Sequence, residues 1–155
     1  MKQIFTSFKK STSLIAILAL SGMTFNASAE KLSGNTASEI TAMMTTGWNL
    51  GNTFDATNGS NNGYALDAET SWGQPKTTQE MITAVRKAGF NTIRIPVSWG
   101  KHSNFKEDPE NFTISEEWMA RVKEVVDYCY NEDLFVILNI HHDNNSGNII
   151  YTLKD

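Results

Sequence analysis

The sequence is poor in cysteine, in positive charge and in long hydrophobic runs, and each shortage excludes a class of protein. Its single cysteine, Cys129, excludes an intrachain disulfide framework and a zinc cluster built from cysteines. The 13 basic residues are outnumbered by 17 acidic ones, so the chain lacks the basic excess that neutralises phosphates, and we expect no nucleic-acid partner. A mean hydropathy of -0.34 excludes a polytopic membrane protein. At 155 residues the chain forms one domain at most.

The N-terminal segment has the composition of an export signal. Lysines precede a short apolar stretch over residues 13–23, and Ala27-Ser28-Ala29 is an A-x-A cleavage site. A membrane anchor fits less well, because a bilayer span takes about 20 consecutive apolar residues. We therefore expect residues 1–29 to be a secretory signal peptide and the protein to be secreted, extracellular or periplasmic, without membrane contact after cleavage.

Past this signal, the chain reads as a short leader followed by alternating strands and helices. Residues 30–40 are small and polar and are interpreted as a mobile leader, with the folded part over residues 41–155. Strands are expected at residues 46–52, 91–97 and 135–140. The segment 135–140 is almost continuously apolar, which is typical of a parallel strand buried on both faces.

Two helices are predicted from their caps and apolar stripes. Thr77 as N-cap, with Glu80 after it, forms a capping box that predicts a helix over residues 78–88. A second helix is expected to begin at Ser115, and its apolar stripe at helical spacing consists of Trp118, Val122, Val125 and Cys129. Cys129 is thus expected to be a small hydrophobic core residue. The resulting order of elements predicts two βαβ units and a parallel sheet with right-handed crossovers.

Unusual polar residues gather where these strands end, which is where parallel α/β folds bind ligands. Asn49 lies in the terminal part of the first expected strand, and Arg94 interrupts the apolar second strand with its side chain opposite to Ile93 and Ile95. A buried guanidinium needs a partner. Two interpretations of Arg94 remain open: it holds a catalytic carboxylate ionised, or it forms a structural ion pair inside the fold.

His141 and His142 follow the third strand and suggest a metal site at first sight. Adjacent residues of a strand point to opposite faces, so the two imidazoles are not expected to share one ion while strand geometry holds. His102 lies in a loop, and no H-E-x-x-H motif is present. We expect a pair of hydrogen-bonding histidines, no metal and no cofactor.

Trp72 and Trp99 lie in loops and have two interpretations, ordinary packing or a platform on which sugar rings stack. Asn49 and several other amides near them favour recognition of hydroxyl groups, since amides both donate and accept hydrogen bonds. An acidic, exported chain also suits a neutral ligand better than a polyanion.

Four motifs run in order along the chain: GWNLGNTFD at 47–55, ETSWGQP at 69–75, AGFNTIRIPVSW at 88–99 and NIHHD at 139–143. Together they resemble the N-terminal part of glycoside hydrolase family 5, of the bacterial endo-β-1,4-glucanase or cellulase type. The resemblance implies an α/β fold, the first three βα units of a (β/α)8 TIM barrel, and hydrolysis of β-1,4-linked glucans with retention. It implies a monomer at full length and no cofactor.

The resemblance also implies roles for single residues. Arg94 matches the arginine that hydrogen-bonds the catalytic nucleophile, and His141 matches the histidine that helps to bind the sugar at the cleavage subsite. Asn49, Trp72 and His142 look like further substrate contacts. In the family, two glutamates about 5–5.5 Å apart do the chemistry, one as nucleophile and one as acid/base.

The sequence departs from the family at this decisive point. It contains no Asn-Glu-Pro motif, which carries the acid/base in the family, and a (β/α)8 barrel typically takes about 250 residues. We therefore expect an incomplete barrel that is inactive alone and exposes unpaired strand edges. Two alternatives remain: a non-catalytic secreted carbohydrate-binding protein, or a complete small α/β domain of flavodoxin type.

Overall fold

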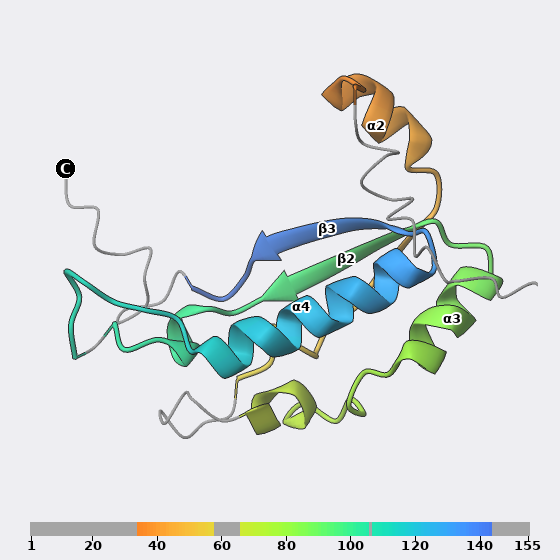
Figure 1. Ribbon diagram of the computed structural model, residues 1–155. Coiled ribbons are helices and arrows are strands. Elements are labelled where there is room, and N and C mark those ends of the chain that lie inside the picture. Colours follow the sequence, from red (N-terminus) through yellow and green to blue (C-terminus); the bar gives the residue numbers. More distant parts are fainter. Residues whose placement is uncertain (1–33, 58–65, 106, 144–155) are drawn as a thin grey trace, which may run out of the picture.

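A computed structural model describes residues 34–57, 66–105 and 107–143. The predicted signal peptide, residues 1–29, lies outside this range. The described part contains one sheet in the order β1-β2-β3, with both neighbouring pairs parallel, and helices α3 and α4 cover one of its faces (Figure 1). The bounds are β1 Gly47–Asn49, α3 Gln79–Lys87, β2 Thr92–Val97, α4 Glu116–Asn131 and β3 Phe135–Ile140. No helix in these ranges is long and apolar enough to cross a membrane.

The register of the sheet separates a packing face from a polar face. Ile93, Ile95 and Val97 of β2 are fully buried and belong to the hydrophobic core shared with the helices. Arg94 lies between them in sequence and therefore belongs to the opposite face. It is paired in register with Asn49 of β1, which places both side chains on the same side of the sheet. The prediction that Arg94 and its neighbours point to opposite sides is thus consistent with the structure.

The helix α3 begins one residue later than predicted. Its N-cap is Thr78, whose side chain accepts a hydrogen bond from the amide of Met81. The prediction of Thr77 as N-cap is therefore wrong. Thr77 is buried instead, its amide donates to Glu69 at 2.8 Å, and its carbonyl oxygen accepts from Arg121 at 2.7 Å. Thr77, which the local sequence predicts to be the N-cap, is instead held by hydrogen bonds to the ion pair of Glu69 and Arg121.

The helix α4 confirms its sequence prediction. Ser115 is the N-cap and accepts from the amide of Trp118. The residues of its apolar stripe are all buried: Trp118, Val122, Val125 and Cys129. Burial raises the pKa of the Cys129 thiol to about 12, so this side chain is an inert core residue.

The strand β3 lies where predicted, but it is not buried on both faces. Ile137, Leu138 and Ile140 are 42, 47 and 59% exposed. The cause is the position of β3 at the edge of the described sheet, because no described element packs beyond it. The apolar content therefore predicts the strand correctly but does not predict how far its two faces are buried.

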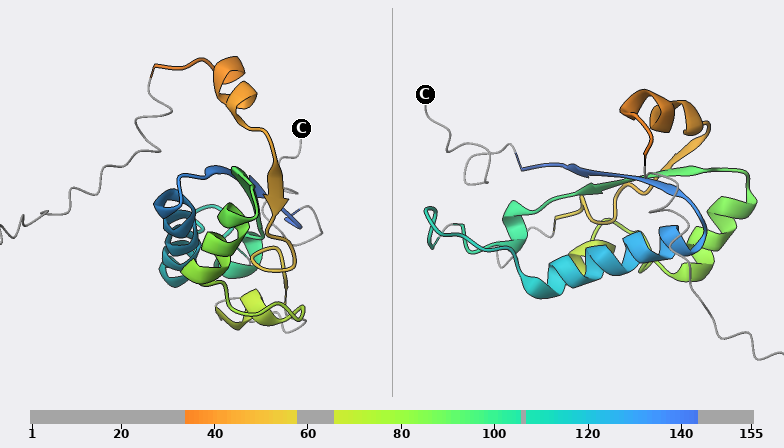
Figure 2. Two further views of the ribbon diagram at one scale, coloured as in Figure 1. Left: turned by 90° about the vertical axis from the view of Figure 1, so that its right-hand side faces the viewer. Right: turned by 45° about the horizontal axis from the view of Figure 1, so that its top comes forward.

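A helix, α2 (Ala37–Met43), lies partly within the expected leader 30–40 and stands apart from the other helices (Figure 2). Thr36 and Glu39 form a capping box at its N-terminus, and none of its residues is buried. The sequence analysis interprets residues 30–40 as a mobile leader and does not predict this helix. The missed signal is the Thr36–Glu39 spacing itself. Mobility of the leader stays a prediction.

A buried ion pair joins α4 to the short 3-10 helix η1 (Leu66–Thr70). The guanidinium of Arg121 donates two hydrogen bonds to the Glu69 carboxylate, at 2.8 and 2.7 Å, and both residues are almost completely buried. The carboxylate raises the pKa of Arg121, so the pair stays charged. Thr77 completes the network from the start of α3. This network fixes the segment that carries Trp72 against the helix layer.

Candidate functional site

The polar face of the sheet carries a hydrogen-bonded pair at its carboxyl edge. Nη1 of Arg94 donates to Oδ1 of Asn49 at 2.6 Å. Arg94 is half-buried, not fully buried as the sequence analysis assumed. In the described part of the chain no carboxylate lies within ion-pair distance of it. The structural ion pair, one of the two interpretations of Arg94, is therefore not found there, and the guanidinium keeps donors available for a further partner.

His141 and His142 lie close together, contrary to the geometric argument from the sequence. The strand ends at Ile140, and His142 has a positive φ of 46°, so the alternation of a strand no longer applies. The two rings are 4.1 Å apart between centroids and tilted by 54°. The expectation that the imidazoles diverge is wrong because the chain turns directly after β3.

Asp55 joins the two histidines. The sequence places it at the end of the first motif, near the expected active face, but assigns it no role in the site. One ligand atom from each of Asp55, His141 and His142 lies within 4.8 Å of the others. Asp55 is buried, and its Oδ1 accepts from the amide of Thr53 at 2.9 Å. The available signal was its position shortly after the first strand, at the same sheet edge as the histidines.

Ser98, which follows β2, holds the two parts of this cluster together. Its hydroxyl lies 3.1 Å from the backbone oxygen of Asp55 and 3.0 Å from that of His141. The amide of His141 also donates to the carbonyl oxygen of Val97 at 2.8 Å. The backbone at both residues is thus fixed by neighbouring strand ends.

Burial, followed by the positive charge on a protonated His142, lowers the pKa of His141. The nearby carboxylates of Asp55 and Asp143 act in the opposite direction and Arg94 in the same direction. His141 is therefore neutral at pH 7, and a neutral imidazole offers one donor and one acceptor. This state suits hydrogen bonding to the hydroxyl groups of a neutral ligand.

Trp72 lies at the rim of the same cluster. Its indole is 42% exposed, and its ring centroid is 5.7 Å from that of His142. Nε1 donates to the carbonyl oxygen of Thr57 at 3.0 Å, which fixes the ring while leaving a face accessible. The structure thus brings Trp72, His141 and His142 together, with Asn49 and Arg94 on the adjoining face of the sheet.

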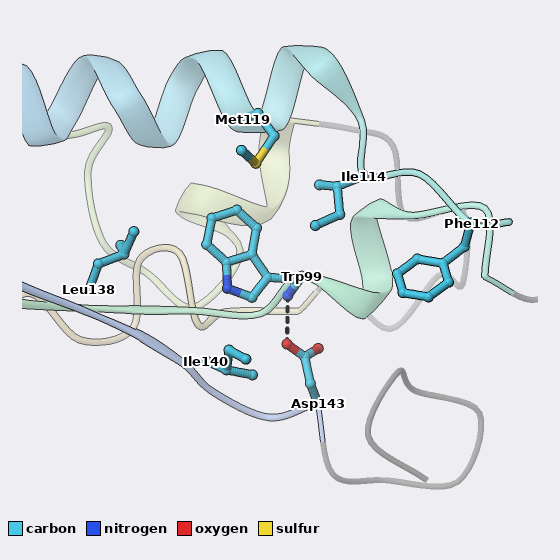
Figure 3. A pocket seen from close by; sticks show the side chains of 7 residues that line it. All are labelled: Trp99, Phe112, Ile114, Met119, Leu138, Ile140 and Asp143. Atoms are coloured by element: carbon cyan, nitrogen blue, oxygen red, sulfur yellow. Dashed lines mark hydrogen bonds between the residues drawn. The ribbon is translucent and has the colours of Figure 1, made fainter. Parts of the chain in front are cut away.

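Trp99 does not join them. It lies in a hollow of about 470 Å³ on the packing side of the sheet, between Met119 and Ile114 on one side and Leu138 and Ile140 on the other (Figure 3). It packs against the hydrophobic core. The sugar-platform interpretation of Trp99 is therefore not supported, whereas packing is.

The side chain of Asp143 accepts hydrogen bonds from backbone amides. Its carboxylate accepts from the amides of Trp99 and Gly100, both at 2.8 Å, at the start of the 3-10 helix η2 (Gly100–His102). Burial raises the pKa of this carboxyl, and the two amide hydrogen bonds offset part of that rise. Two other acids of the four motifs are engaged as well: Glu69 is paired with Arg121, and Oδ1 of Asp55 accepts from the amide of Thr53. Each of these carboxylates is thus engaged by a contact within the described part of the chain.

The chain matches a family of known proteins. Residues 52–154 match the family Cellulase (glycosyl hydrolase family 5). Endoglucanase A of Clostridium longisporum is 54% identical over 111 residues, covering 70% of this chain and 20% of that protein. Endoglucanase A of Paenibacillus barcinonensis is 46% identical over 130 residues, covering 83% of this chain and 30% of that protein. The chain thus spans less than a third of the length of these relatives.

Solved structures lead to the same family. The GH5-4 broad specificity endoglucanase from Clostridium longisporum superposes with a TM-score of 0.64 at 49% identity, covering 70% of this chain and 30% of that one. The Ruminococcus champanellensis enzyme with bound cellotriose gives a TM-score of 0.66 at 47% identity, covering 71% of this chain and 32% of that one. These neighbours imply a TIM-barrel fold, of which the parallel βα units described here are a part. The chain belongs to the cellulases of glycosyl hydrolase family 5.

Proposed function

We propose that this chain supplies the N-terminal, substrate-binding part of an endoglucanase that cleaves β-1,4-linked glucans with retention. The observation that carries the proposal is the cluster of Trp72, His142 and His141 at the carboxyl edge of a parallel sheet. This edge is where (β/α)8 enzymes place their active sites. The chain also carries 46–54% identity to endoglucanases across the same residues.

In this proposal each residue acts on a particular part of the site. The exposed indole of Trp72 stacks on a sugar ring, and the neutral imidazole of His141 hydrogen-bonds its hydroxyl groups. Asn49 orients the guanidinium of Arg94, which hydrogen-bonds the nucleophile carboxylate and keeps it ionised. His142 contributes a further substrate contact beside Trp72.

The polysaccharide is a β-glucan of the cellulose type, and the related Ruminococcus champanellensis enzyme holds cellotriose. Retaining hydrolysis takes a nucleophile and an acid/base about 5–5.5 Å apart. Neither glutamate has a counterpart in this sequence, so the 155 residues provide binding and positioning groups without the reacting pair.

A hybrid enzyme tests the proposal without requiring the chain to fold alone. The segment of the Clostridium longisporum endoglucanase that aligns with residues 47–143 is replaced by those residues of this chain. We expect the hybrid to hydrolyse carboxymethyl-cellulose. Arg94→Lys should lower kcat, since a lysine cannot reproduce the planar guanidinium. Trp72→Ala should raise KM at least several-fold, because burying an aromatic side chain contributes about 1.5–3 kcal/mol.

Trp48→Phe is the matched control in the hybrid. Trp48 is exposed and contacts Phe90 on the packing side, so its replacement should leave both kinetic constants unchanged. A hybrid that melts cooperatively but has no activity would overturn the proposal. So would an Arg94→Lys variant with the kcat of its parent.

We also propose that residues 1–29 direct export and that the mature protein is secreted. The support is the sequence alone: the lysines, the short apolar stretch and the A-x-A site. Expression in a bacterial host with N-terminal sequencing of the exported protein tests it. A mature N-terminus at Glu30 is expected, and retention of Met1 on cytoplasmic protein would refute it.

A further inference from the structure

We propose that Asp55, His141 and His142 form a binding site for a divalent transition-metal ion of the zinc and copper class, at the place where the sugar is expected to bind. The three ligand atoms lie within 4.8 Å of one another. Two imidazoles and one carboxylate are a ligand set that such ions prefer, and three protein ligands leave a fourth position open.

The geometry is close to what such an ion requires. Zinc binds histidine nitrogen and carboxylate oxygen at about 2.0–2.2 Å, which separates tetrahedral ligand atoms by about 3.4 Å. The described atoms therefore need to approach by at most about 1.4 Å. His142 is exposed, and a rotation of its side chain would supply this approach.

Two of the three ligands are held in place by their surroundings. The carboxylate of Asp55 is oriented by the amide of Thr53, and Ser98 fixes the backbone of Asp55 relative to that of His141. Hydrogen bonds that orient ligands in this way raise metal affinity. The positive φ of His142 is the feature that brings the second imidazole to the same side as the first.

An ion at this place excludes the sugar. The imidazoles that would hold it belong to the same two residues, His141 and His142, that contact the sugar in the proposed function. Metal and glucan therefore compete, and the ion acts as an inhibitor. Binding of the metal itself does not depend on the proposed function, whereas the competition does, so the two are tested separately.

Binding is measured by titrating Zn²⁺ by calorimetry into the hybrid enzyme without an affinity tag, which provides a folded context. One Zn²⁺ per molecule is expected, and Cu²⁺ should bind more tightly, following the order of stability of divalent ions. Mg²⁺ should not bind, because it prefers oxygen ligands. Nitrogen couplings in the electron paramagnetic resonance spectrum of the Cu²⁺ form would report two imidazole ligands.

The variants are chosen to preserve the fold. Asp55→Asn retains an oxygen that accepts from Thr53, and His142→Gly retains the positive φ without strain. Each should weaken Zn²⁺ binding at least about tenfold, as loss of even a supporting group does. Glu117→Gln, on the exposed first turn of α4, is the control and should bind like the parent.

The competition is measured in the hybrid, where Zn²⁺ should raise KM for the glucan without lowering kcat. Stoichiometric binding that is unchanged in both Asp55→Asn and His142→Gly would overturn the metal site, as would no binding to a folded hybrid. Binding with the expected variants but no effect on KM would retain the metal site and overturn the shared location.

Discussion

Asn49 connects the first strand to the guanidinium of Arg94, and its orientation depends on a glycine two residues further on. A Cβ added at Gly51 would lie 2.6 Å from Nδ2 of Asn49. The atom that must move is the end of a flexible side chain, so Gly51→Ala should cost little stability. It should displace Asn49 from Arg94 and lower kcat in the hybrid enzyme. A Gly51→Ala hybrid with unchanged kcat and an unchanged melting temperature would show that the Asn49 contact does not matter.

His102 is the buried group whose titration should be visible in stability. Its ring stacks on Trp118 at 3.5 Å, and neither ring nitrogen has a hydrogen-bond partner among the described residues. Burial lowers its pKa from 6.5 to about 4, and the charge of Asp67 opposes this only in part. Between these values the unfolded chain binds a proton that the folded chain does not. Stability should therefore fall as the pH falls from 6.5 towards 4, by at most about 1.4 kcal/mol per pH unit.

Urea unfolding of the hybrid enzyme and of its His102→Phe variant at several pH values measures this effect. Phenylalanine retains the stacking and removes the titrating group. The difference in unfolding free energy between the two proteins should change across this window and be constant above it. An identical pH profile for both proteins would contradict the assignment.

At the scale of the element, the start of α3 provides a direct contrast between neighbouring threonines. Thr78→Ala removes the N-cap and should destabilise by about 1 kcal/mol. Thr77→Val should be neutral or stabilising, because the buried Oγ1 of Thr77 has no hydrogen-bond partner among the described residues. Chemical unfolding measures the free energy of unfolding of both variants. A larger loss of stability in Thr77→Val than in Thr78→Ala would indicate that Thr77 is the N-cap.

The ion pair between η1 and α4 links the helix layer to the segment that carries Trp72. Arg121→Met leaves the Glu69 carboxylate buried and unpaired, which should cost about 3–5 kcal/mol. Adding Glu69→Leu should recover much of this loss, since an apolar pair of similar volume often replaces a buried ion pair at little cost. A double variant as unstable as the single one would indicate that the pair itself, and not the orphaned charge, determines stability.

Sequence reasoning succeeded for these elements where the determinants are local and failed where they are tertiary. The cap and stripe of α4 are local, and both are confirmed. Thr77 is fixed by Glu69 and Arg121, which are distant in sequence, so the capping box misled the prediction. The cluster of Asp55 with the two histidines depends on where β3 stops, and periodicity does not define such an end.

At the scale of the whole molecule, β3 presents an apolar face. Leu138 and Ile140 are paired in register with Ile95 and Val97, so they lie on the packing side of the sheet. Both are about half exposed and line the hollow around Trp99. Exposed apolar strand edges promote association. We expect the 155-residue chain to bind a hydrophobic dye and to aggregate at micromolar concentration. Leu138→Lys together with Ile140→Lys should reduce both effects, and light scattering that is unchanged by this pair would assign the association to another surface.

Under the proposed function, these residues bind and position a β-glucan while lacking the glutamates that cleave it. This is tested by the release of reducing ends from carboxymethyl-cellulose, measured for the pure 155-residue chain beside the hybrid enzyme. We predict no release by the chain above buffer and clear release by the hybrid. Turnover by the pure chain, lost when Arg94 is replaced, would contradict the claim, because the reacting pair would then lie among residues to which we assign only binding.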